Sequence, residues 1–106
     1  MTPERNSEVI AEIRQQIEGG KVPGEALYSA FLSNEYPSMS ELSRRLGVSV
    51  AAISRMVNGR NNISVEMAVR IESLTGLSAE DLMGVQNMYE LMKARQTYEN
   101  APVQVS

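Results

Sequence analysis

The sequence predicts an all-α fold, in which five core helices follow one extra N-terminal helix. Three features of the 106 residues favour this class. Apolar residues recur at spacings of three and four, which is the period of a helix with one buried face. Serines and glycines stand where these segments begin and end, as helix caps do. No segment shows the strict alternation of apolar and polar residues that is typical of a strand.

The first predicted helix covers residues 5–18, within an amphipathic N-terminal extension at residues 1–20. Its apolar stripe consists of Val9, Ile10, Ile13 and Ile17. We expect this stripe to dock on the chain's own domain, although it could also serve as an arm for a partner. A second helix opens at Pro23, because proline is favoured in the first turn of a helix. The inner face of that helix is predicted to carry Ala26, Leu27, Ala30 and Phe31.

Residues 38–60, SMSELSRRLGVSVAAISRMVNGR, predict two short helices joined by a tight turn. Ser38 can cap the first helix, and Glu41 three residues later completes a capping box. Gly47 suits the left-handed position that ends the helix, and Ser49 can cap the second helix. The buried faces are predicted to carry Leu42 and Leu46 in the first helix, and Ile53, Met56 and Val57 in the second. This pattern is typical of a helix-turn-helix, with an ordinary helical hairpin as the alternative.

The outward face of the second helix carries small, polar and cationic side chains, which suit the edges of bases in a major groove. Arg55 could read guanine and Asn58 could read adenine, while Val50 and Ala51 could touch thymine methyl groups or act as inert spacers. Ser49 is expected to cap first and to contact phosphate second. The predicted DNA-binding residues are Ser49, Val50, Ala51, Ser54, Arg55, Asn58, Arg60 and Asn61, the last two as phosphate clamps. Arg44 and Arg45 are further candidates, one of which could simply be solvated.

Charge is distributed unevenly along the chain, and the uneven distribution favours a nucleic-acid partner. The net charge is −3. Residues 1–37 carry three basic and six acidic residues, and residues 71–106 carry two basic and five acidic residues. Residues 38–70 carry five arginines against two glutamates, a net charge of +3. Because phosphate binding depends on local charge, the helix-turn-helix segment is the expected site of contact with DNA.

Composition excludes several classes of function. The chain has no cysteine and no histidine, which removes disulfides, thiol nucleophiles, histidine bases and the usual zinc sites. No serine has an accompanying base and no glycine-rich loop resembles a phosphate cradle, so we expect no catalysis, no metal and no cofactor. The charged N-terminus shows no signal peptide, and no apolar run is long enough to span a membrane. A cytoplasmic location is therefore expected.

The remaining helices are predicted from their caps. Ser64 begins one helix and Gly76 stops it, and Ser78 begins a last helix that runs to about Gln96. The DNA-binding domain then covers residues 21–96, and residues 97–106 form a flexible tail. The last helix carries a heptad-like seam of Leu82, Val85, Tyr89 and Met92. This seam is either packing on the core or the interface of a two-fold homodimer that binds an inverted repeat. We favour the dimer.

Four segments between Pro23 and Met92 resemble the HigA/VapI-type antidotes, a branch of the Cro/repressor-like (XRE) helix-turn-helix family. The segments are PGEAL at 23–27, LSRRLGVSVAAISRMVNGR at 42–60, ISVEMAVRI at 63–71 and LSAEDLMGVQNMYEL at 77–91. PGE, with Gln86, Asn87 and Tyr89 in the last helix, is the more specific part. The resemblance implies a dimer that represses its own operon and, with a toxin partner, neutralises a ribosome-dependent mRNA endonuclease.

The leading hypothesis is therefore a sequence-specific DNA-binding transcriptional repressor that is the antitoxin of a toxin–antitoxin module. Its partners would be a double-stranded DNA operator, a second copy of the chain and a cognate toxin protein. One alternative is a phage or plasmid repressor without a toxin. Another is a protein-interaction scaffold that has lost DNA binding. An enzyme is the least favoured interpretation.

Overall fold

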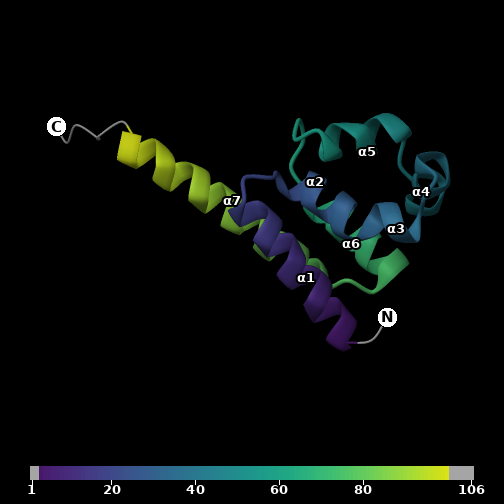
Figure 1. Ribbon diagram of the computed structural model, residues 1–106. Helices are drawn as coiled ribbons and strands as arrows, with labels where there is room; N and C mark the ends of the chain where they lie inside the picture. Colours follow the sequence, from purple (N-terminus) through teal and green to yellow (C-terminus); the bar gives the residue numbers. More distant parts are fainter. Residues whose placement is uncertain (1–2, 101–106) are drawn as a thin grey trace.

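The computed structural model describes the backbone of residues 3–100 and the side chains of residues 5–99 (Figure 1). Within this range the secondary structure is entirely helical, which confirms the predicted all-α class. The elements are α1 (Pro3–Glu18), α2 (Pro23–Leu27), the π-helical turn η1 (Tyr28–Leu32), α3 (Ser33–Glu35), α4 (Met39–Leu46), α5 (Val50–Val57), α6 (Val65–Thr75) and α7 (Ala79–Asn100). Because α2, η1 and α3 are continuous, they form one helix, and the predicted plan of one extra helix and five core helices is found.

The N-terminal helix is part of the core. α1 and α7 lie side by side, and α2 lies between α1 and α5 (Figure 1). The predicted apolar stripe of α1 faces inward, and Ile13 and Ile17 are fully buried. The stripe therefore docks on the chain's own domain, as expected, because α7 and α2 offer it an apolar surface.

The second helix contains a π-helical turn that was not predicted from the sequence. Ala26, Leu27 and Phe31 of the predicted inner face are buried, but Ala30 is only half-buried. Leu32, which was not assigned to this face, is fully buried. A π turn inserts one extra residue into the helical repeat, and this extra residue lets Phe31 and Leu32 both face the core.

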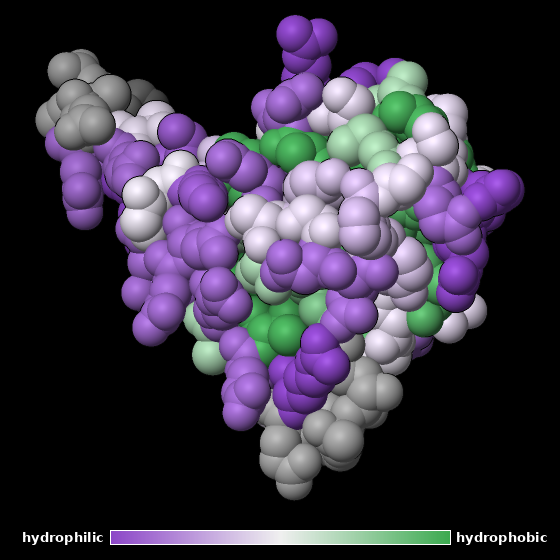
Figure 2. Space-filling model, turned by 45° about the vertical axis from the view of Figure 1, so that its right-hand side comes forward, coloured by the Kyte–Doolittle hydropathy of each residue, from purple (hydrophilic) through white to green (hydrophobic). Residues whose placement is uncertain are grey.

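The last helix is longer than predicted. α7 continues through residues 97–100, which were assigned to a tail, and residues 101–106 lie outside the described part of the chain. The C-terminal part of α7 projects from the body of the molecule (Figure 1), and the side chains from Lys93 to Glu99 are exposed. Figure 2 shows mainly hydrophilic side chains on the side that leads to the C-terminus. This part of α7 therefore adds little to the core.

The seam predicted on α7 is divided by the fold. Leu82 and Val85 have no exposed surface, because α1, α2 and α6 all pack against α7. Tyr89 and Met92, further along the helix, are half-buried. A partner chain cannot touch Leu82 or Val85 without opening the core. For these two residues the assignment to a dimer interface is therefore corrected to core packing, and only Tyr89 and Met92 keep an accessible edge.

Candidate nucleic-acid interface

Two caps and one turn fix the helix pair α4–α5. The Oγ of Ser38 accepts a hydrogen bond from the backbone N–H of Glu41 at 3.2 Å, and the Oγ of Ser49 accepts one from Ala52 at 3.0 Å. Gly47 ends α4 with φ 72°, a left-handed conformation that favours glycine. The two serine caps and the left-handed glycine are confirmed. The Glu41 carboxylate, which was predicted to complete a capping box with Ser38, forms ion pairs with Arg44 and Arg45 instead.

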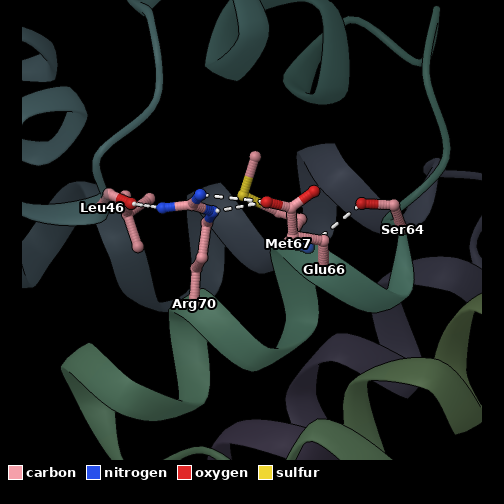
Figure 3. Close-up of polar contacts among 5 residues, drawn as sticks. All are labelled: Leu46, Ser64, Glu66, Met67 and Arg70. Carbon is pink, nitrogen blue, oxygen red and sulfur yellow. Dashed lines mark hydrogen bonds and ion pairs between the residues drawn. The ribbon is translucent and has the colours of Figure 1, made fainter.

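The end of α4 is held from outside the helix pair. Arg70, on α6, donates a hydrogen bond from Nη1 to the backbone carbonyl of Leu46 at 2.9 Å (Figure 3). The Nη2 of the same guanidinium donates to Glu66 at 2.9 Å, one turn earlier on α6. Ser64 caps α6 by accepting from the N–H of Met67 at 3.1 Å. One arginine thus satisfies a carbonyl at the end of α4 and fixes the position of that end against α6.

The base of α5 rests on a very close contact with α2. A Cβ atom at Gly24 would lie 2.1 Å from the carbonyl oxygen of Met56, so only glycine fits there. Met56 and Ile53 form the buried face of α5, and Val57 is half-buried. The PGE segment singled out in the sequence therefore has a structural role, which is to let α2 and α5 approach each other.

The opposite face of α5 is open to solvent. Among the eight predicted DNA-binding residues, only Ser54 is half-buried. The exposed ones are Ser49, Val50, Ala51, Arg55, Asn58, Arg60 and Asn61. In Figure 1, α5 lies along the edge of the molecule that is remote from α1 and α7. The structure thus brings the predicted residues together on one accessible surface, which we call the α5 face.

Ion pairing separates the arginines of the basic segment into two groups. Arg44, Arg45 and Arg70 each pair with a glutamate of their own helix. Arg55 and Arg60 take part in none of the ion pairs found among the described residues. Because Arg44 and Arg45 share one carboxylate, one of the three uncompensated positive charges of this segment stays on α4. The other two, those of Arg55 and Arg60, lie on the α5 face, where an anionic ligand could neutralise them.

The loop after α5 folds back onto the helix. The backbone N–H groups of Arg60 and Asn61 both donate to the carbonyl of Arg55, at 2.9 and 3.2 Å. Gly59 allows this reversal with φ 76°. In the amide orientation that satisfies both of its polar atoms, Asn61 accepts from Nε of Arg55 at 3.2 Å and donates to the carbonyl of Arg60 at 3.0 Å. No pattern in the sequence indicated this link, because it depends on how the loop closes.

Other kinds of site find less support. Within the described residues, no group of three or more acidic side chains is placed to hold a metal ion. In the same part of the chain, none of the helices has the length and apolar character needed to cross a membrane. The pocket between α4 and α6 is lined by Arg44, Arg45 and Arg70, but these three arginines are already engaged by glutamates.

The helix pair α4–α5 lies within a region that matches a known family. A helix-turn-helix family model matches residues 38–82, from the N-terminal cap of α4 to the first turn of α7. The match supports an XRE-type helix-turn-helix domain with a Cro/repressor-like fold, and it supports a DNA-binding transcription regulator. This family is generally non-enzymatic. Searches of curated proteins and of solved structures found no significant match.

Proposed function

We propose that the protein is a sequence-specific repressor that places α5 in the major groove of an operator. The observation that carries this proposal is the α5 face, on which Arg55 and Arg60 are exposed and free of the ion pairs found among the described residues. A guanidinium without an acidic partner can donate two hydrogen bonds to guanine, or one to a phosphate, without first breaking a salt bridge. Small side chains at Val50, Ala51 and Ser54 leave room for close approach to base edges.

A selection of random duplexes for binding, followed by footprinting on the DNA upstream of the gene, tests this function. We expect the selected sequence to occur in the upstream region. Because non-specific binding is mainly electrostatic, the assays should be run at two salt concentrations. Binding that shows no sequence preference at either salt would contradict a repressor and favour the interaction scaffold.

We further propose that the repressor is a two-fold dimer, since one short recognition helix offers few base contacts. With Leu82 and Val85 in the core, an exposed apolar surface at the start of α6 and α7 is the better candidate for the junction. Val65 and Val69 are 66% and 50% exposed and border a hollow of about 410 Å³. Ala79, Glu80 and Met83 line the rest of this hollow.

A glycine next to Met83 in the sequence of α7 supports a helical neighbour at this surface. Gly84 lies in the interior of α7, where glycine costs about 1 kcal/mol relative to alanine. Nothing lies within 4 Å of the position that a Cβ of Gly84 would occupy. The space that this glycine leaves open would be filled by the second copy. The two recognition helices would then contact half-sites about 34–36 Å apart, or a multiple of that distance.

Sedimentation of Val69→Glu tests the junction. Because Val69 is half exposed, the variant should keep the helical content of the parent protein while its mass falls to that of one chain. Its affinity for an inverted repeat should fall as well, since the second contact of a dimer is intramolecular. A variant that remains dimeric would place the junction elsewhere, with the accessible edge at Tyr89 and Met92 as the next candidate.

The finer proposal is that this repressor is the antitoxin of a toxin–antitoxin module. It rests on the resemblance of the four segments described above. Two of the more specific residues act within the fold: Gly24 lets α2 approach α5, and Gln86 accepts a hydrogen bond from the N–H of Ile63 at 2.9 Å. Because these two residues act in holding the fold together, evidence for a toxin must be sought in the neighbouring gene.

Co-expression with the adjacent open reading frame separates the antitoxin from a repressor without a toxin. If the neighbour encodes the toxin, its expression alone should arrest growth and cleave mRNA, and this chain should restore growth. A neighbour that is harmless when expressed alone would favour the phage or plasmid repressor.

A further inference from the structure

We infer that Asn61 is a positioning residue, which sets the specificity of the α5 face by holding the guanidinium of Arg55 in one orientation. This inference rests on the proposed reading of DNA by α5. The sequence predicts that Asn61 contacts the phosphate backbone. Its contacts in the folded chain point instead to a role that acts through Arg55.

The hydrogen bond to Asn61 occupies only one edge of the guanidinium. In the amide orientation that satisfies both polar atoms of Asn61, its Oδ1 accepts from Nε of Arg55 at 3.2 Å. The four N–H bonds on Nη1 and Nη2 remain available, and no ion pair among the described residues uses them. Two parallel donors at the tip of arginine match O6 and N7 of guanine. Asn61 therefore leaves Nη1 and Nη2 of Arg55 free to bind guanine end-on. It blocks the alternative mode of guanine recognition, in which Nε is one of the two donors.

The amide of Asn61 is itself held in place. Its nitrogen donates to the carbonyl of Arg60 at 3.0 Å, and the backbone N–H of Asn61 donates to the carbonyl of Arg55 at 3.2 Å. The loop that carries Asn61 is thus anchored to the same residue whose side chain it orients. Arginine has many rotamers in solution, and ordering it before binding removes part of that entropic cost.

The test is a double-mutant cycle on the duplex that the wild-type protein selects, with random DNA as the second probe. Asn61→Ala should bind the selected duplex about threefold to tenfold more weakly, and its affinity for random DNA should be unchanged. The preference should be lost at the same base pair that Arg55→Ala affects. The double variant should bind no more weakly than Arg55→Ala alone, because Asn61 acts through Arg55.

Asn62→Ala is the matched control. Asn62 is the neighbouring exposed asparagine, and its amide donates to Glu90 at 3.0 Å, away from Arg55. This variant should keep the base preference of the wild type. Thermal unfolding of all variants should be unchanged, since Arg55, Asn61 and Asn62 are all exposed at the surface.

Three outcomes would overturn the inference. If Asn61→Ala lowers the affinity for selected and for random DNA by the same factor, Asn61 is a phosphate contact. If the losses of affinity add up in the double variant, Asn61 acts independently of Arg55. If the base preference of Asn61→Ala is unchanged, Asn61 has no role in specificity. Failure of the wild-type protein to select a sequence would be a different result, because it would contradict the proposed function itself.

Discussion

The outer face of α5 and the seam of α7 are both helical stripes that the sequence marked for contact with a partner, yet the fold treats them differently. On α5, Arg55 and Asn58 remain exposed, because Gly24 and the core hold the opposite face. On α7, Leu82 and Val85 have no exposed surface, because α1 covers them together with α2 and α6. The composition of a helical stripe indicates what kind of surface could bind to it. Only the rest of the fold decides whether other helices of the same chain already cover that stripe.

The largest effect is expected from Val85→Glu. Because Val85 is fully buried, the variant places a charge in the core without a partner and should lose about 4 kcal/mol or more of stability. Circular dichroism and urea unfolding measure this loss. Val69→Glu makes the same change at a half-exposed valine, so it should keep the fold of the single chain even where it separates the two copies. A Val85→Glu variant that stays folded but becomes monomeric would restore the seam as the dimer interface.

Arg55→Ala tests the α5 face directly. Removal of the guanidinium should weaken specific binding by about 1–3 kcal/mol and relax the preference at one or two base pairs. Titrations of the selected duplex and of single-base variants measure both effects. If affinity for random DNA falls by the same amount, Arg55 contacts phosphate and the reading of bases must come from Asn58 or Ser54.

Ser49 caps α5 and is also a proposed phosphate contact. Two substitutions distinguish these roles. Ser49→Ala removes the cap on Ala52 and should cost about 1 kcal/mol in the free energy of unfolding. Ser49→Asp keeps a capping oxygen, so stability should be retained, but its charge should weaken DNA binding. Thermal melts and gel shifts of both variants measure the two effects. Equal DNA affinity of Ser49→Asp and the wild type would place Ser49 away from the phosphates.

The smallest effect is expected from Arg60→Ala. Loss of one phosphate contact should weaken binding to selected and to random DNA alike. It should also lower the slope of log affinity against log salt by about one unit. A salt titration with each duplex measures this slope. Arg44→Ala is the control, since Arg44 is already paired with Glu41 and its removal should leave the slope unchanged. A slope that stays constant in Arg60→Ala would contradict the role of a phosphate clamp.

Local features of the fold were predictable because they depend on neighbouring residues. The caps at Ser38 and Ser49 and the left-handed Gly47 follow from spacings of a few residues. The burial of Val85 depends on the helices that pack against α7, among them α1 from the other end of the sequence, and a stripe on one helix contains no information about that cover. The Asn61–Arg55 link depends on a loop reversal at Gly59. The π turn that buries Leu32 has no simple sequence signal either.

The hydrogen bond from Arg70 to Leu46 limits how the helix pair α4–α5 can be transferred to another protein. The guanidinium that secures the last carbonyl of α4 comes from α6, beyond the end of the helix pair. Residues 38–60 therefore cannot be transferred alone to another protein as a DNA-recognition unit. A chimaera that carried only these residues would leave the Leu46 carbonyl without this donor. An exchange of specificity between two such proteins should change only the outward positions of α5, or should transplant α6 together with α4 and α5.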